Sequence, residues 1–421
     1  MFQTKVIETK NIFGALDIGS SKVSCAVGKI QHMNQSSDAS IKILGIGYQL
    51  SKGLRGGNII DIEDLEDSIL NAVHAAEQSA QHNIRELYVS IPGRWIVSHV
   101  VKTEISLSKH PISQEHLQKI FTLNSEKFKR LNQHVLHILP LSYSVDNLTG
   151  ITDPKGMVGQ KLEAKLLVMT TKNELINNIS LCISRCHLDV AGFIAAPYAS
   201  AMSTLLSDEM SLGVTHIDIG AGQTTVTTFK DGSMTSTATI PLGGIQITHD
   251  IAKGLGIDVA QAERLKNLYG NLFMQKSEEK ENIVLSQVGE VAPIHTRHIA
   301  RGFLVHIIRS RIEEILEQIM LKFKSKELDQ SAFRQIVVTG GVSQIQGLKE
   351  LITSLFGLPT RLSHPMGIYG TSEIIQNPSF SVTAGLLLFA AQEMELYDLK
   401  QLGLKKMSLW KKITSWIRRN M

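Results

Sequence analysis

The chain has 421 residues, of which 43% are hydrophobic, 19% charged and 5% aromatic, and its formal net charge is +4. This length and composition predict two or three folded domains with large cores and exclude wholesale disorder. Six cations and no acid follow residue 400, so the first 400 residues carry a net charge of −2, and this balance excludes a nucleic-acid-binding body.

The N-terminal residues, the apolar runs and the cysteines do not indicate secretion, a transmembrane span, disulfides or bound zinc. Residues 1–10 are polar and charged, and no apolar run approaches the roughly 18 residues of a spanning helix, so we expect neither secretion nor a transmembrane span. Three cysteines are too few for a disulfide framework, and their odd number does not allow all of them to pair. Because no second ligand cluster accompanies Cys182 and Cys186, we expect buried thiols rather than zinc ligands. P-loop and dinucleotide-binding motifs are absent.

The first predicted element is a β-hairpin with a polar tip. An apolar run ends in Leu16-Asp17-Ile18-Gly19-Ser20-Ser21, and a second β-prone run extends from Val23 to Val27. Such a tip lets backbone N–H groups converge on an anion, and the aspartate at the strand end can hold a hydrated divalent cation. For a single copy, an ordinary strand-to-turn sequence is the alternative.

A helix and an insertion follow the hairpin. Asp61 is expected to cap a helix whose inner face holds Leu65, Ile69 and Val73. From about residue 87 to 161, short strands around a helix near Gln114–Phe128 indicate an insertion. The first domain then resumes with a buried strand at Ala164–Thr170.

The hairpin motif recurs in the second half. Ile217-Asp218-Ile219-Gly220-Ala221-Gly222 leads into another β-prone run, Thr224 to Phe229. Internal similarity of this kind implies duplicated supersecondary units. The two tips together predict a nucleotide phosphate chain clamped between two related domains.

A third glycine cluster supports the nucleotide hypothesis. Gly340-Gly341 follows the apolar run Ile336–Thr339 and precedes a helix that starts near Leu348 and ends at Gly357. Paired glycines after a strand allow a flat ligand such as adenosine to approach closely. A plain tight turn is the alternative.

The last fifteen residues predict an amphipathic helix. Its apolar face holds Leu409, Trp410, Ile413, Trp416 and Ile417, and its polar face holds Lys411, Lys412, Ser415, Arg418 and Arg419. Tryptophan prefers the headgroup boundary, and each cation gains about 1 kcal/mol near anionic phospholipid. We expect this helix to lie in a membrane surface; a helix docked on the protein's own core is the alternative.

These motifs resemble the phosphate and adenosine motifs of the actin and sugar-kinase superfamily. Within it, the chain is similar to the FtsA family of bacterial cell-division proteins. The narrower resemblance rests on the tail and on the segments 134–140, 143–146, 240–251 and 262–266. It covers nearly the whole chain.

The resemblance implies an α/β, actin-like (ribonuclease H-like) fold of two domains with an inserted α+β subdomain and a C-terminal amphipathic helix. The expected divisions are 1–86 with 163–211 for the first domain, 87–162 for the insertion, 212–245 with 331–395 for the second domain, 246–330 for a subdomain that closes the cleft, 396–406 for a linker and 407–421 for the membrane-targeting helix.

The resemblance also implies ATP and Mg²⁺ as ligands. The nucleotide-binding positions are expected to be Asp17, Gly19, Ser20, Ser21, Lys22, Asp218, Gly220, Ala221, Gly222, Gln223, Gly243, Glu263, Lys266, Gly340, Gly341 and Ser343. Asp17 and Asp218 would hold Mg²⁺ through water. A surface position for Lys22 and a solvated helix face for Glu263 and Lys266 are the alternatives.

Family resemblance further implies function. Such proteins polymerise on the inner face of the cytoplasmic membrane at the division septum, hold FtsZ filaments there as peripheral membrane proteins and recruit later division proteins. A soluble actin-like scaffold of a pilus or secretion platform shares the body but not the tail. A small-molecule kinase would need a catalytic aspartate at the cleft, and we can place none.

Two departures from the superfamily pattern predict slow ATP hydrolysis. Gly220-Ala221-Gly222-Gln223-Thr224-Thr225 replaces a motif that often contains Thr and Asp, and Ala196-Pro197 has no acid where related filaments and chaperones have Glu before Pro. Phosphoryl transfer depends mostly on positioning and electrostatics. We therefore expect the nucleotide to act mainly as an assembly switch.

Overall fold

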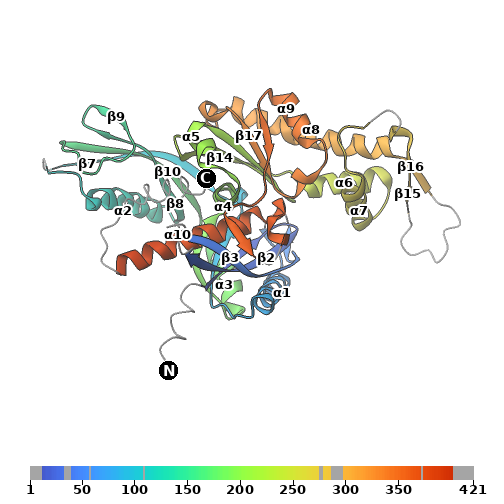
Figure 1. Ribbon diagram of the computed structural model, residues 1–421, viewed down its shortest axis with the longest axis horizontal. Coiled ribbons are helices and arrows are strands. Elements are labelled where there is room, and N and C mark those ends of the chain that lie inside the picture. The colour runs from blue at the N-terminus through green and yellow to red at the C-terminus, as the bar shows by residue number, and fades with distance from the viewer. Residues whose placement is uncertain are drawn as a thin grey trace.

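The computed structural model describes residues 12–32, 39–55, 58–107, 110–274, 278–285, 297–370 and 373–401. Two α/β halves lie side by side, with a further sheet at one end and a helical region at the other (Figure 1). The predicted tail helix at 407–421 lies outside these residues. No helix within the described ranges is long and apolar enough to cross a membrane.

The first half contains a six-stranded sheet in the order β11-β6-β1-β2-β3-β19. Its strands are β1 (Ile12–Ile18), β2 (Lys22–His32), β3 (Ala39–Leu50), β6 (Glu86–Ile91), β11 (Asp189–Ala195) and β19 (Ile368–Gly370). β1 and β2 form the predicted antiparallel hairpin, which pairs Ile18 with Val23 beside the tip. A small ladder of β4 (Leu54–Arg55) and β5 (Asn58–Ile59) precedes the first helix.

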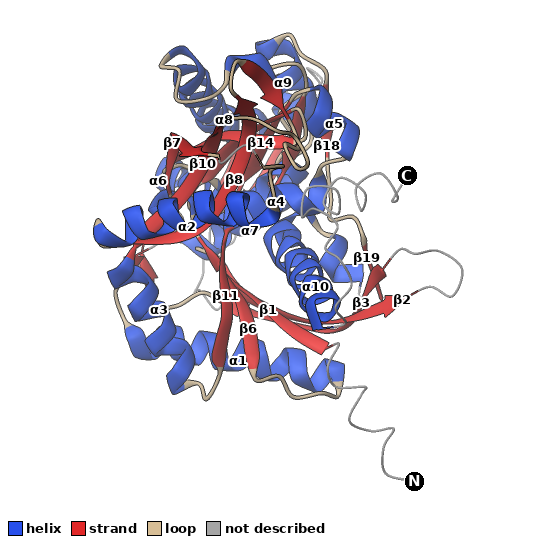
Figure 2. Cartoon of the chain, turned by 90° about the vertical axis from the view of Figure 1, so that its left-hand side faces the viewer, coloured by secondary structure: helices blue, strands red, loops and turns tan. Residues whose placement is uncertain are grey.

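Helices cover both faces of this sheet (Figure 2). α1 (Ile62–Ala80) and α3 (Asn173–Arg185) pack on one face, and α4 (Ala196–Thr204) and α10 (Ser381–Gln401) on the other. The prediction for α1 is confirmed, because Asp61 accepts a hydrogen bond from the Asp64 N–H and Leu65 is fully buried. All three cysteines are buried free thiols, as predicted.

The second half repeats the architecture of the first. Its sheet has the order β14-β13-β12-β17-β18, formed by β12 (Val214–Ile219), β13 (Thr224–Lys230), β14 (Ser233–Ile240), β17 (Ile336–Thr339) and β18 (Thr360–Leu362). In both halves two antiparallel pairs are followed by two parallel pairs, so β14-β13-β12-β17-β18 corresponds to β3-β2-β1-β6-β11. The sequence repeat therefore marks a duplicated sheet with Asp17 and Asp218 at equivalent strand ends.

The helical region packs on the outer face of the second sheet. It contains α6 (Gly244–Leu255), α7 (Val259–Tyr269), α8 (Arg301–Lys324) and the two-stranded ladder of β15 (Asn282–Leu285) and β16 (Arg297–Ala300). Together with α9 (Leu348–Phe356), α6 and α8 bury isoleucines and leucines against β12 and β17. The short α5 (Ser207–Leu212) lies near β13 and β14.

The inserted region is a four-stranded sheet in the order β7-β10-β8-β9 with one helix on it. Its elements are β7 (Val97–Ser106), α2 (Gln114–Arg130), β8 (Gln133–Val145), β9 (Leu148–Ile151) and β10 (Lys161–Lys172). In Figure 1 it lies at the left end of the molecule.

Both edges of the insertion differ from the sequence-based boundaries. β6 lies in the first-half sheet although the expected insertion starts at residue 87, and β10 pairs with β7 and β8 although the first domain is expected to resume at residue 163. The reason is that β10 is buried on both faces. Leu166 and Val168 face the insertion core, whereas Leu167 and Met169 face the core shared by the two halves. A doubly buried strand gives the same apolar run in either sheet.

The insertion joins the first half through a buried histidine. His137 of β8 accepts a hydrogen bond at Nε2 from the Ala195 N–H, 3.0 Å away, and its ring lies 5.0 Å from Tyr198 and 5.7 Å from Phe389 between centroids. Burial lowers the pKa of His137 to about 4. The ring is therefore neutral, and a proton on Nε2 would remove the acceptor that Ala195 uses.

Acidification should weaken this joint, and His137→Gln should reduce the effect because an amide oxygen can still accept from Ala195. Between pH 7 and pH 5 the imidazole of the unfolded protein, with a pKa near 6.5, takes up a proton, whereas the buried ring of the folded protein does not. The folded state therefore loses stability as the pH falls. We expect His137 to contribute about 2 kcal/mol to this loss. Urea unfolding of both proteins at the two pH values measures it, and equal losses would contradict the prediction.

Candidate functional site

A cavity of about 610 Å³ lies between the two halves. Fourteen of the sixteen sequence-predicted ligand positions line it, namely Asp17, Gly19, Ser20, Ser21, Lys22, Asp218, Gly220, Ala221, Gly222, Gln223, Glu263, Lys266, Gly340 and Gly341. Gly243 and Ser343 do not line the cavity but lie directly behind its wall. The fold thus brings together segments more than 300 residues apart in the sequence.

The two hairpin tips have the same backbone geometry. The Gly19 N–H donates to the Lys22 carbonyl at 3.1 Å, and the Gly220 N–H donates to the Gln223 carbonyl at 3.0 Å. The tips also approach each other, because a Cβ built on Gly222 would lie 2.5 Å from the Ser20 Oγ. A side chain at Gly222 would therefore force the two halves apart.

Each tip is preceded by a half-buried aspartate held by one serine. The Ser90 Oγ donates to Asp17 Oδ1 at 2.7 Å, and the Ser200 Oγ donates to Asp218 Oδ2 at 2.6 Å. Burial raises the pKa of Asp17, and burial together with the charge of Asp17 raises the pKa of Asp218 to about 6. Two such carboxylates favour a cation near them, since opposite charge stabilises their ionised forms.

The glycine turn after β17 is packed against the second aspartate. Gly340 has φ +89, and a Cβ there would lie 2.4 Å from Asp218 Oδ1. The Ser343 Oγ donates to the Gly340 carbonyl at 2.7 Å, so Ser343 braces the turn from behind. Gly243 has a similar supporting role, since its Cβ would lie 2.5 Å from the Gly220 carbonyl oxygen.

Glu263 and Lys266 of α7 form an ion pair in the wall of the second half. Lys266 Nζ lies 2.6 Å from Glu263 Oε2 and 2.9 Å from the hydroxyl of Thr248. Burial raises the pKa of Glu263, but the hydrogen bonds from Lys266 and Thr248 outweigh it and leave a net lowering. Lys266 is buried, so the solvated-face alternative does not hold for it.

Lys22 points across the cavity to a segment that the sequence does not single out. Its Nζ donates to the Ser379 Oγ at 2.6 Å and lies 3.3 Å from the centroid of the Phe380 ring. Ser90, Ser200 and Ser379 all escape sequence reasoning, because single hydroxyls in otherwise ordinary strands, helices and turns carry no pattern. The spacing of a motif cannot indicate a partner that tertiary packing supplies.

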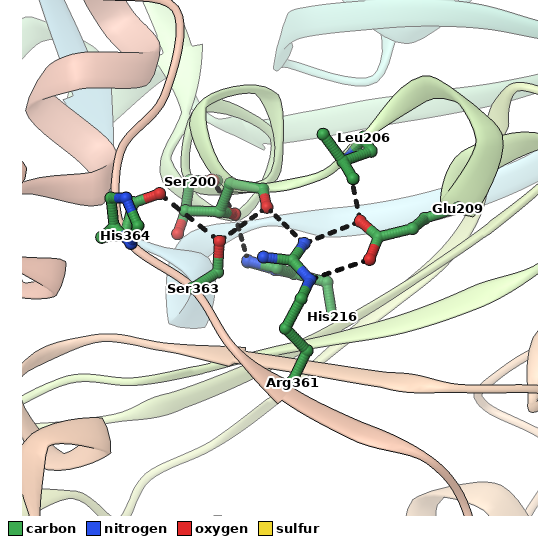
Figure 3. Close-up of polar contacts among 8 residues, drawn as sticks. Ser200, Leu206, Glu209, His216, Arg361, Ser363 and His364 are labelled. Carbon is green, nitrogen blue, oxygen red and sulfur yellow. Dashed lines mark hydrogen bonds and ion pairs between the residues drawn. The ribbon is translucent and has the colours of Figure 1, made fainter. Parts of the chain in front are cut away.

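Behind Asp218, a polar network fixes the end of α4 (Figure 3). Arg361 forms a bidentate ion pair with Glu209, at 2.7 and 2.9 Å, and also donates to the Thr204 carbonyl at 2.9 Å. Thr204 donates its hydroxyl proton to the Ser200 carbonyl at 2.7 Å, so it accepts from Nε2 of His216. Burial and the charge of Arg361 lower the pKa of His216 to about 3, which keeps the ring neutral.

The donor set fits a magnesium-bound nucleotide. The cavity has room for one, two equivalent glycine-containing tips line it, and Asp17, Asp218 and Lys22 line it beside these tips. Within the described residues no group of three or more His, Cys, Asp and Glu side chains could hold a metal. Mg²⁺ commonly takes most of its ligands from water and substrate phosphates, with only one or two carboxylates from the protein.

Sequence comparison assigns the family. A family model described as "Cell division protein FtsA" matches residues 215–385, and another, "SHS2 domain inserted in FTSA", matches residues 93–170. The cell division protein FtsA of Agrobacterium fabrum is 34% identical over 384 residues, covering 90% of this chain and 87% of that protein. The chain belongs to the FtsA family of cell-division proteins. The SHS2 match coincides with the four-stranded sheet from β7 to β10.

Solved structures with the same fold support an actin-like assignment for this FtsA-family chain. A "PilM-PilN type IV pilus biogenesis complex" has a TM-score of 0.65 at 16% identity, covering 91% of this chain and 99% of that one. MreB5 of Spiroplasma citri bound to ADP has a TM-score of 0.54 at 14% identity, with 93% and 99% coverage. The predicted actin-like fold with an insertion is confirmed.

The contact at Gly340 gives a test of the site's architecture. Gly340→Ala should destabilise the protein by more than about 3 kcal/mol, because it combines a left-handed backbone with a clash against Asp218. Gly357→Ala is the matched control, since Gly357 has φ +65 but nothing within 4 Å of its Cβ position, and should cost only about 1 kcal/mol. Denaturant unfolding measures both, and equal costs would contradict the account.

Proposed function

We propose that this FtsA-family protein binds ATP with Mg²⁺ in the cavity between its halves, polymerises on the inner face of the cytoplasmic membrane and holds FtsZ filaments there through its C-terminal helix. Later divisome proteins are recruited to this assembly. The observation that carries the nucleotide proposal is the convergence of two equivalent hairpin tips and two serine-bonded aspartates on one cavity.

Each part of the cavity has a role in this proposal. The two tips hold phosphates through backbone N–H groups, with Lys22 adding a positive charge. Asp17 and Asp218 hold the hydrated cation, Glu263 and Lys266 face the ribose, and the Gly340 turn faces the adenosine. A bound nucleotide supplies negatively charged phosphates that both halves contact at the same time. The MreB5 structure bound to ADP, a protein of the same fold, supports this assignment.

The cavity also supports slow hydrolysis. Ala196, at the start of α4, lines the cavity with a methyl group where related filaments and chaperones have glutamate. A methyl group can neither orient nor deprotonate a water molecule. We therefore propose that ATP acts mainly as an assembly switch.

The hydrolysis proposal is tested by restoring an acid. We expect phosphate release by the unmodified protein to be slower than about 1 per second, the lower limit for ordinary kinases. Ala196→Glu should raise the rate at least about tenfold, and the isosteric Ala196→Gln should raise it less, because an amide can orient a water molecule but cannot deprotonate it. Phosphate release under saturating MgATP measures all three proteins. Rapid turnover by the unmodified chain would refute the proposal.

Membrane attachment rests on the tail and on family membership. The amphipathic pattern of residues 409–419 combines two tryptophans with a basic face, a combination typical of helices that lie in anionic membrane surfaces. The fold likeness to the pilus complex, at 16% identity, extends to the fold alone. The FtsA family model and the FtsA relative therefore favour the septal role over a soluble scaffold.

Co-sedimentation with anionic liposomes in MgATP tests the anchor. The intact chain should pellet and form lipid-bound filaments, and Trp416→Glu should remain in solution because it places a charge on the apolar face. Ser415→Glu is the matched control, since it adds the same charge to the polar face and should still pellet. If Trp416→Glu and the intact chain behave alike, the soluble-scaffold alternative takes over.

A further inference from the structure

The contact between Lys22 and the start of α10 joins the first hairpin tip to the C-terminal helix. Lys22 begins β2 directly after the tip, while Ser379 and Phe380 belong to the 3-10 helix Pro378–Phe380 that immediately precedes α10. The Lys22 ammonium has both a hydroxyl acceptor and an aromatic face as partners. Burial lowers the pKa of Lys22 to about 8, although the charge of Asp17 opposes this.

The segment 377–383 contacts both halves of the molecule. On the second half, Asn377 donates to Gln344 Oε1 at 2.8 Å, and the Ser381 hydroxyl lies 2.7 Å from that of Thr339. On the first half, the hydroxyl of Thr383 lies 2.7 Å from that of Ser24, and the edge of the Phe380 ring meets Tyr48. A change in the relative position of the two halves would therefore alter the contacts of this segment.

Lys22 also lines the cavity beside the Ser20–Ser21 tip. A phosphate oxygen is a stronger acceptor for an ammonium than a neutral hydroxyl, and a charge-assisted bond exceeds an ordinary cation–π contact. The Lys22 ammonium already has partners in Ser379 and Phe380, and a charged phosphate oxygen beside the tip would draw it away from these weaker partners. The two sets of partners therefore compete.

We propose that Lys22 is a phosphate-sensing switch that exchanges its contacts with Ser379 and Phe380 for the phosphates of a bound nucleotide and so loosens the first turn of α10. This inference rests on the proposed nucleotide binding and adds its route of transmission. α10 lies across the first-half sheet and packs on α4 (Figure 2). The chain beyond α10 leads to the predicted tail, so phosphate occupancy reaches the membrane-binding end through this helix.

The switch predicts that removing a wall contact tightens nucleotide binding. Phe380→Leu keeps most of the buried volume but removes the ring face, and Ser379→Ala removes the hydroxyl acceptor. Each should raise the affinity for MgATP about three- to tenfold, because Lys22 no longer loses a partner on binding. Phe389→Leu, in α10 itself, is the matched control. The Phe389 ring contacts Tyr88, His137 and Tyr198 rather than Lys22, so the affinity of this variant for MgATP should be unchanged.

A double-mutant cycle isolates the competition. Lys22→Gln should lower the affinity, and adding Phe380→Leu to it should give no gain. Isothermal titration calorimetry with MgATP measures each affinity. Failure of the unmodified protein to bind MgATP overturns the proposed function itself. Binding by the unmodified protein with no gain in either Phe380→Leu or Ser379→Ala overturns only the switch.

Amide hydrogen exchange supplies a second measurement that does not depend on affinity. In the unmodified protein and in Phe389→Leu, saturating MgATP should speed exchange in peptides covering residues 378–388, while the hairpin tips become protected. In Lys22→Gln, saturation should leave this segment unchanged. Slower exchange of residues 378–388 in the unmodified protein on binding MgATP would overturn the switch.

Discussion

Two half-buried aspartates facing one cavity set the main physical constraint on this molecule. Asp17 and Asp218 lie at equivalent strand ends. Burial and repulsion by Asp17 raise the pKa of Asp218 to about 6. One serine hydroxyl on each carboxylate offsets only part of this cost. The centre of the site is therefore electrostatically unfavourable on its own, and the two halves must be held together elsewhere.

Apolar packing behind the cavity holds the two halves together. α10 and α4 share one core with residues of both sheets and of the inserted sheet, so the three regions are joined by a single hydrophobic cluster. β19, which follows the second-half sheet in the chain, pairs with β3 of the first half. By contrast, several contacts beside the cavity, such as Thr339 with Ser381 and Asn377 with Gln344, are single hydrogen bonds between neutral side chains. Such hydrogen bonds contribute about 1 kcal/mol each, so they can rearrange while the core persists.

The sequence predicts the repeated parts of this structure well and the tertiary parts poorly. The two hairpins and the Gly340 turn follow from local patterns, because strand alternation and glycine requirements are set by near neighbours. The family resemblance adds Glu263 and Lys266, which no pattern marks. The placement of β10 fails, because a strand buried on both faces does not reveal which sheet it joins. The serine hydroxyls that bond to Asp17, Asp218 and Lys22 are not predicted either, because tertiary packing alone selects them.

The crossing of the chain between halves explains how these parts are coupled. β11 belongs to the first sheet and continues directly into α4, whose last carbonyl is fixed by Arg361 and Ser363 of the second half. The chain therefore passes from one half to the other through α4, and Ala195 and Ala196 form the junction between β11 and this helix. His137 of the inserted domain accepts its hydrogen bond at this junction, from the Ala195 N–H. Any rotation of the halves about α4 would act on that bond, so the insertion is mechanically linked to the cavity. The described residues from β7 to β10 do not line the cavity, whereas Pro92 and Trp95, which precede β7, do.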